Sequence, residues 1–173
     1  MRDYEKVADL AEGPQTVVRD TLGLLCGKKL GFGCYREVFE LPWMPAFVLK
    51  LETDAGSFHN VLEWEVWREI KDSKWSGYFA PCEAISATGA ALLMRRTRPI
   101  KAFPEGLTLP SFFQDVKPDN FGLLKGRIVC HDYSISELIR SNLRGTKVKP
   151  VSTHIGRDRR DIVAAVGDAL KEG

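Results

Sequence analysis

The segment around Asp115 contains the residues that are best suited to chemistry. Asp115, Lys117 and Asn120 stand at offsets of zero, two and five in a proline-containing loop, and Asp132 ends an apolar strand 17 residues after Asp115. Phosphoryl transfer needs such a set, because a carboxylate must orient the acceptor hydroxyl and a lysine must neutralise the transferring group, while an amide and a second carboxylate hold Mg²⁺. Each residue alone is typical of a polar loop, but a chance loop rarely has this spacing. The spacing therefore indicates phosphoryl-transfer chemistry.

A glycine-rich turn could hold the phosphates. Gly31 and Gly33 lie between two predicted strands in the stretch Leu30–Val38. Glycines let the backbone approach a phosphate closely, and the exposed N–H groups can bind its oxygens. The same pattern is also common in tight turns that bind nothing. A Rossmann phosphate loop is excluded, because a strand and not a helix follows the glycines.

A lysine inside an apolar strand is the third candidate. Alternation along the strand Ala46–Leu51 places Val48 and Lys50 on one face and the larger apolar side chains on the other. Glu63 and Glu65 on the following helix are the carboxylates that could pair with Lys50 and hold it towards a phosphate. Alternatively, Lys50 reaches water at the edge of the strand, and either glutamate belongs to the helix surface.

Residues 1–94 predict a scaffold of strands and helices for these side chains. Apolar residues at helical spacing predict two helices, a period of two predicts five strands, and Thr88-Gly89 predicts a hairpin turn. The helices are expected at Pro14–Cys26 and Phe58–Lys71, and the strands at 29–35, Glu37–Leu41, Ala46–Leu51, Cys82–Thr88 and Ala90–Met94.

The second half of the chain predicts less regular structure. Three prolines break Arg98–Ser111 into a loop, and Gly122–Gly126 is typical of a hairpin between short strands. Arg157–Glu172 carries an apolar stripe at helical spacing, which predicts a final helix.

The order of these segments resembles that of the protein-kinase-like superfamily, in which a glycine-rich loop, a strand lysine, a helix glutamate, an Asp-x-Lys-Pro-x-Asn loop and an Asp-Phe-Gly segment follow one another. All five have counterparts here, between about residues 30 and 134. The stretch DVKPDNFGLLKGRIVCHDYS, with NVLEWEVW before it, is most similar to compact kinase-like proteins of bacteria and bacteriophages.

The resemblance implies an α+β, protein-kinase-like two-lobed fold with a five-stranded antiparallel N-lobe sheet plus one helix and a minimal C-lobe. The chain would form one domain with three parts: an N-terminal helical extension (1–28), an N-lobe (29–96) and an abbreviated C-lobe with the catalytic loop (97–173).

The resemblance also implies a role for each matching residue, with ATP and Mg²⁺ as the cofactors. Asp115 would be the catalytic base with Lys117 beside it, and Asn120 and Asp132 would hold the metal. The residues expected to bind the nucleotide are Gly31, Gly33, Val38 and Val48, the ion pair of Lys50 with Glu63, and Met94, Arg95 and Thr97 in the hinge that bonds adenine.

The chain departs from the family pattern in several places. Arg36 replaces the third loop glycine, Phe113-Gln114 replaces the His-Arg before the catalytic Asp, and Tyr133-Ser134 replaces Phe-Gly. Only 17 residues separate Thr97 from Asp115, which leaves no room for the two helices that usually support the catalytic loop.

This shortness predicts that the lobe obtains its core from elsewhere. We expect the first helix, Pro14–Cys26, and the last, Arg157–Glu172, to supply the missing apolar packing, with a second copy of the chain in a homodimer as a further source.

Three functions follow from the residues and the resemblance. The leading prediction is ATP- and Mg²⁺-dependent phosphoryl transfer to a Ser or Thr hydroxyl of a protein substrate. A second is a pseudokinase that binds and modulates a host protein, which the short C-lobe favours. A third is a small-molecule kinase, although such enzymes usually have an added helical lobe for the substrate.

Composition excludes several other classes. The four cysteines form no Cys-x-x-Cys pair and have no histidine at zinc-finger spacing, so we expect reduced thiols. There is no export signal and no apolar run long enough to span a membrane, so the prediction is a cytoplasmic protein, in the host cytoplasm if phage-encoded. Net charge is only +2, and the basic stretch 140–160 has no interleaved aromatics, which favours a solvated segment over a nucleic-acid site.

Overall fold

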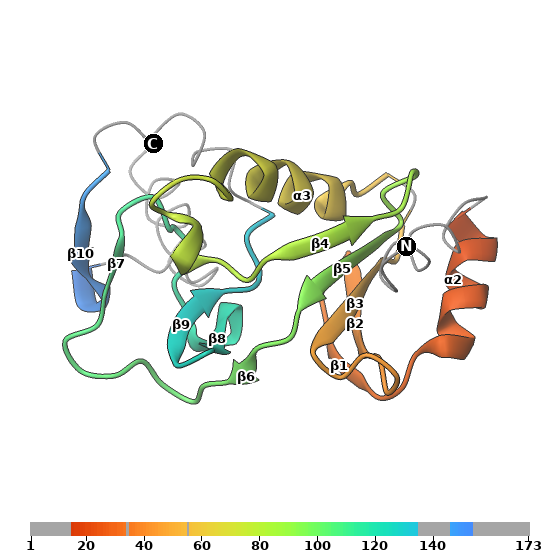
Figure 1. Ribbon diagram of the computed structural model, residues 1–173, viewed down its shortest axis with the longest axis horizontal. Coiled ribbons are helices and arrows are strands. Elements are labelled where there is room, and N and C mark those ends of the chain that lie inside the picture. The colour runs from red at the N-terminus through yellow and green to blue at the C-terminus, as the bar shows by residue number, and fades with distance from the viewer. Residues whose placement is uncertain (1–14, 34, 55, 135–145, 154–173) are drawn as a thin grey trace, which may run out of the picture.

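A five-stranded antiparallel sheet with one helix on each face forms the first part of this α+β protein (Figure 1). The computed structural model describes residues 15–33, 35–54, 56–134 and 146–153. The strand order is β1-β2-β3-β5-β4. The elements are α2 (Gln15–Leu25), β1 (Lys29–Phe32), β2 (Arg36–Glu40), β3 (Phe47–Glu52), α3 (His59–Ile70), β4 (Cys82–Ile85) and β5 (Ala91–Arg95). The predicted sheet and both helices in this region are thus confirmed, with boundaries that differ by only one to three residues.

The central strand β3 shows why this sheet is covered on both sides. All six of its residues are buried. Val48 packs in the cluster under α3, together with Val66 and Ile70, whereas Leu49 and Leu51 pack in the cluster on the opposite face. The predicted alternation is therefore confirmed, and it places Lys50 on the α3 side of the sheet.

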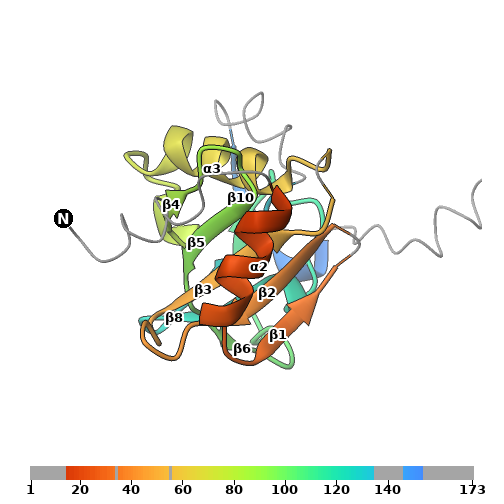
Figure 2. The same ribbon diagram turned by 90° about the vertical axis from the view of Figure 1, so that its right-hand side faces the viewer.

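The first helix lies on the outer face of this sheet and not against the second half of the chain. Figure 2 shows α2 across β2 and β3, and Leu22, which is 1% exposed, packs against Leu49 and Leu51. The expectation that this helix supplies core to the abbreviated lobe is wrong. The connection from α2 to β1 is only three residues long, and within it Gly27 donates to Glu40 O at 2.9 Å, so the helix is held beside β2.

The second half contains two small sheets and short 3₁₀ turns. A three-stranded sheet has the order β6 (Arg98–Pro99), β8 (Phe121–Leu124), β9 (Arg127–Cys130), and β7 (Thr108–Pro110) pairs with β10 (Val148–Pro150). The stretch Arg98–Ser111 is thus not entirely a loop, because Pro99 and Pro110 end short edge strands, where a missing N–H is tolerated. The 3₁₀ turns are η1 (Ser76–Tyr78), η2 (Pro118–Asn120) and η3 (Val151–Thr153).

The predicted hairpin in this half is confirmed. Between β8 and β9, Lys125 and Gly126 have φ values of 48° and 80°, the two positive values that a type I′ turn requires. The hairpin fixes the register of β8 against β9, in which Phe121 lies opposite Cys130.

An aromatic cluster forms the core of the second half. The rings of Phe79 and Phe113 lie 5.0 Å apart, and that of Phe113 lies 5.3 Å from Phe121. This cluster is continuous with the core under α3. It provides the apolar packing of this half of the chain. The predicted final helix, Arg157–Glu172, lies outside the described residues. Within the described part of the chain, no helix has the length and apolar character needed to cross a membrane.

Candidate functional site

Lys50 and Glu63 form a buried ion pair between β3 and α3. Lys50 Nζ lies 2.8 Å from Glu63 Oε2, and the side chains are 4% and 0% exposed. Asn60, Glu63, Val66 and Ile70 are the buried residues of α3, so the helical period turns Glu63 inward. Glu65 points outward and pairs with Arg68 at 3.0 Å. Of the two carboxylates left open by the sequence, Glu63 is the partner.

Arg36 is a member of this cluster that sequence reasoning missed. Its Nη1 lies 2.7 Å from Glu63 Oε2 and its Nη2 lies 2.7 Å from Asp132 Oδ1, while only 10% of its side chain is exposed. The contact through Nη1 is an ion pair without a directed hydrogen bond among the described residues. The alternation of β2 was a signal for this contact. Val38 lies opposite Lys50 in the sheet, and Arg36, two residues before Val38, has its side chain on the same face of β2 as Val38.

The charges in the cluster hold one another in their ionised forms. Burial alone raises the pKa of Glu63, but the positive charges of Arg36 and Lys50 outweigh it and lower that pKa to about 2. Burial likewise lowers the pKa of Arg36, and the charges of Glu63 and Asp132 reverse the effect and raise it. Glu63 also accepts a hydrogen bond from Tyr133 N at 2.9 Å.

The predicted catalytic residues lie together in the loop that leads into η2. Lys117 Nζ lies 2.8 Å from Asp115 Oδ2. Asn120 Nδ2 donates to the same oxygen at 2.7 Å and to Asp115 O at 2.9 Å. The hydrogen bond and charge of Asp115 raise the pKa of Lys117. The Asp115 side chain is 40% exposed, so an acceptor from solution can reach it.

The β8–β9 hairpin brings this loop close to Asp132. Phe121 lies opposite Cys130, and His131 N donates to Asn120 O at 2.9 Å, so Asp132 follows directly after the last paired residue. Lys50 lies on the other side, where its Nζ donates to His131 O at 2.5 Å. Two segments that carry the candidate site, the Asp115 loop and the Lys50 cluster, therefore meet at His131 and Asp132.

His131 is a second residue that the sequence did not reveal. Its Nδ1 is 2.8 Å from Thr97 Oγ1, and its Nε2 is 2.9 Å from Asp119 O. A carbonyl can only accept, so Nε2 carries the proton and Nδ1 accepts from the Thr97 hydroxyl. Burial and the nearby charge of Lys50 lower the pKa of His131, which favours this neutral form. His131 thus links Thr97, the loop that contains Asp119, and Lys50 to one another.

The expected hinge residues have partners within the protein. Met94 is fully buried in β5, opposite Val48. The N–H of Arg95 donates to Pro81 O at 2.9 Å, so it is not available to adenine. Thr97 lies against β8 so closely that a Cβ on Gly122 would approach its Oγ1 to 2.4 Å.

The glycine-rich turn is exposed and lies at the end of the β1–β2 hairpin. Gly31 pairs with Val38 in register, and Gly33 N donates to Arg36 O at 2.8 Å. A Cβ built on Gly31 would meet no atom within 4 Å. The protein's own packing therefore does not require glycine at this position. Val38 packs against the same core cluster as Val48.

Both residues expected to bind Mg²⁺ already have partners within the protein. One oxygen of Asp132 is paired with Arg36, and Asn120 donates to Asp115 through Nδ2, whereas a metal would bind its side-chain oxygen. Among the residues that the structure describes, no group of three or more His, Cys, Asp or Glu side chains could hold a metal.

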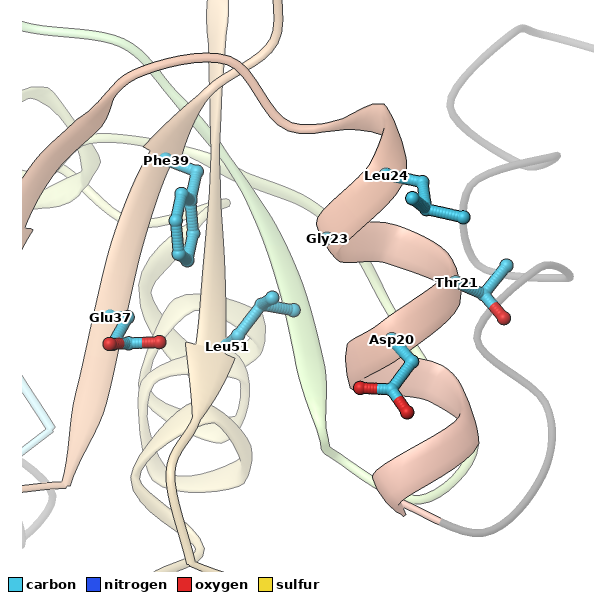
Figure 3. Close-up of a pocket in the computed structure, with 7 residues that line it drawn as sticks. All are labelled: Asp20, Thr21, Gly23, Leu24, Glu37, Phe39 and Leu51. Carbon is cyan, nitrogen blue, oxygen red and sulfur yellow. The ribbon is translucent and has the colours of Figure 1, made fainter.

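A shallow groove lies between α2 and the sheet, on the face opposite Lys50. Figure 3 shows Phe39 and Leu51 beside the helix, with Thr21 and Leu24 pointing away from the sheet. None of the predicted site residues lines this groove, so it is separate from the candidate site.

Compared with known proteins, the chain matches no family model and no curated protein.

Proposed function

We propose that this chain is a compact kinase-like protein that binds ATP and transfers its γ-phosphoryl group to a hydroxyl acceptor. The observation that carries the proposal is that Lys117 and Asn120 both contact the Asp115 carboxylate, at 2.8 Å and 2.7 Å. His131 links this loop to the buried Lys50–Glu63 pair, because its N–H donates to Asn120 O and its O accepts from Lys50. The strand order of the sheet and the position of α3 support a protein-kinase-like two-lobed fold, with residues 29–96 as the N-lobe and 97–173 as an abbreviated C-lobe.

Each role rests on the chemistry of a side chain and its place in the site. Lys50, held by Glu63, supplies a fixed positive charge for the nucleotide phosphates. Asp115 accepts and orients the acceptor hydroxyl, and Lys117 beside it offsets the charge on the transferring group. Gly31 and Gly33 cover the phosphates, an assignment supported by the open space around Gly31.

The expected acceptor is a Ser or Thr hydroxyl of a protein. The exposure of Asp115 supports a large acceptor, because a small substrate would need an enclosing pocket. The kinase-like resemblance implies Mg²⁺ as a cofactor, with Asn120 and Asp132 as its ligands. No step is assigned to the metal, because Asp132 is paired with Arg36.

A second candidate function is a pseudokinase that binds a host protein without phosphorylating it. The contact of Arg36 with Asp132 favours this function, because it engages the carboxylate that a catalytic metal would need.

Phosphoryl transfer is tested with radiolabelled ATP offered to the pure protein, a generic protein substrate and a cell extract. We expect wild type to label a protein and Asp115→Asn to label about 10² to 10⁴ times more slowly, because the base is lost while the fold is kept. The matched control is Asp119→Asn, an exposed carboxylate four residues away whose change should leave labelling intact.

Equal labelling by wild type and Asp115→Asn would show that Asp115 is not the base. If wild type binds ATP but labels nothing, transfer is wrong and the pseudokinase function takes its place.

A further inference from the structure

Arg36 connects three segments of the candidate site. It begins β2, and its guanidinium lies 2.7 Å from Glu63 Oε2 on α3 and 2.7 Å from Asp132 Oδ1 after β9. Its Nη2 also donates to Ser134 Oγ at 3.3 Å. The residue is 8% exposed. These partners come from both halves of the chain, so Arg36 holds the end of the glycine-rich hairpin against the segment that contains Asp132.

Neighbouring contacts fix Arg36 in this position. The ring of Tyr35 stacks on that of His59 with centroids 4.5 Å apart, and His59 Nδ1 lies 3.0 Å from Ser134 Oγ. The start of β2 is therefore attached to α3 and to the segment after β9 through two adjacent side chains.

The charges that the ion pairs of Arg36 and Lys50 join balance without a divalent ion. The two carboxylates of the cluster, Glu63 and Asp132, face two cations, Arg36 and Lys50. Without Arg36 the same set carries one excess negative charge, which a bound cation would offset. The protein-kinase-like glycine-rich loop has its third glycine where this chain has Arg36, so the extra positive charge is a property of this chain.

Lys50 does not provide this charge to Asp132. Its Nζ lies 2.8 Å from Glu63 Oε2 and donates to His131 O at 2.5 Å. Arg36 is thus the cation that contacts the Asp132 carboxylate among the residues that the structure describes.

We propose that Arg36 is the resident cation of Asp132 and excludes divalent metal ions from that carboxylate. A metal ion at Asp132 would lie within a few ångströms of the guanidinium, and the two like charges would repel each other. The repulsion is smaller than in a fully buried site, because the Asp132 side chain is 47% exposed. Displacing Arg36 would in turn leave a buried guanidinium without one of its two carboxylates. A consequence, which rests on the proposed function, is that the protein binds ATP without needing Mg²⁺.

The proposal is tested by Mn²⁺ titration without nucleotide, in which the electron paramagnetic resonance signal of free Mn²⁺ falls as the ion binds. We expect wild type to show no saturable binding and Arg36→Gln to bind Mn²⁺ at least about tenfold more tightly. Arg36→Lys is the matched control, because it keeps the charge and should still exclude the metal. Adding Asp132→Asn to Arg36→Gln should remove the gain.

Saturable Mn²⁺ binding by wild type that Asp132→Asn abolishes would overturn the proposal, and this arm does not depend on any Arg36 variant folding. A folded Arg36→Gln protein that gains no Mn²⁺ affinity would overturn it as well. Lys50 remains paired with Glu63 in this variant, and circular dichroism checks that its fold is retained.

Thermal stabilisation by ATP separates this inference from the proposed function. We expect ATP to raise the melting temperature of wild type equally with Mg²⁺ and with EDTA, and that of Arg36→Gln mainly with Mg²⁺. If ATP stabilises wild type only with Mg²⁺, the inference is wrong. If ATP stabilises neither protein under either condition, the proposed function fails, and the Mn²⁺ titration still decides the role of Arg36.

Discussion

Glu63 is the side chain on which most of the buried polar contacts of the site converge. It accepts hydrogen bonds from Lys50, Arg36 and Tyr133 while being fully buried. A carboxylate with several donors and two cations is stable only in its ionised form, which is why its pKa is lowered to about 2. The residue thereby fixes the lysine and the arginine in one geometry.

Glu63 should make the free energy of unfolding depend on pH in the acidic range. Its pKa is lowered in the folded protein to about 2 from an ordinary value of 4.5, so its contribution is complete above about pH 4.5 and is lost as pH falls towards 2. We expect a loss of about 3 kcal/mol in the free energy of unfolding across this range, at about 1.4 kcal/mol per pH unit. Urea unfolding at a series of pH values measures it.

The matched variants are Glu63→Gln and Glu65→Gln. The first should lack this part of the acid dependence, and the second should keep it, since Glu65 lies on the surface with Arg68. Parallel pH profiles for wild type and Glu63→Gln would contradict the assignment of the low pKa.

At the scale of elements, periodicity predicted local structure well. The alternation in β3 correctly separated Val48 and Lys50 from Leu49 and Leu51, and the glycine of the β8–β9 turn marked a real hairpin. Periodicity could not show where an element packs. The apolar side of α2 fits either half of the chain, and the short connection to β1 decides its place.

Individual contacts between distant segments were also beyond the sequence. The sequence showed that Arg36 replaces a glycine and shares a strand face with Val38, but it could not show the contact with Asp132, which is 96 residues away. His131 stood next to a predicted metal ligand, yet its bonds to Thr97 and Asp119 depend on how three segments meet.

Gly122 should be required by the close approach of β8 to Thr97. A Cβ at this position would lie 2.4 Å from Thr97 Oγ1 and 2.9 Å from Arg98 O, and the backbone oxygen cannot move away easily. We expect Gly122→Ala to lower the free energy of unfolding by about 1–3 kcal/mol. Gly23→Ala is the control, because the helix offers open space there, and it should stabilise by about 0.5–1 kcal/mol. Urea unfolding of both variants checks this; a Gly122→Ala protein as stable as wild type would contradict the packing.

At the scale of the whole molecule, one continuous core joins the two halves. The cluster that contains Val48 and Ile70 under the large sheet also contains Phe113 and Phe121. In addition to this apolar core, the contacts of Arg36 with Glu63 and Asp132 form a polar connection between the same two halves. We therefore expect the described part of the chain to unfold in a single transition.

Phe113 should be central to that cooperativity. It is 7% exposed and packs against Phe79 and Phe121, so Phe113→Ala should lower the free energy of unfolding by about 3–5 kcal/mol. Phe32→Ala, at a residue that is 84% exposed, should change it by less than about 0.5 kcal/mol. Thermal melts followed by near- and far-ultraviolet circular dichroism measure both, and separate transitions in wild type would contradict a shared core.

The most direct test of the account is ATP binding to wild type, Lys50→Met and Lys71→Met by isothermal titration calorimetry. Lys50→Met leaves Glu63 paired with Arg36, so the fold should persist while the charge for the phosphates is lost. We predict that wild type and Lys71→Met, at an exposed residue, bind ATP at one site with equal affinity, and that Lys50→Met binds at least about tenfold more weakly. Equal binding by Lys50→Met, or no binding by wild type, would contradict the proposal that this cluster is a nucleotide site.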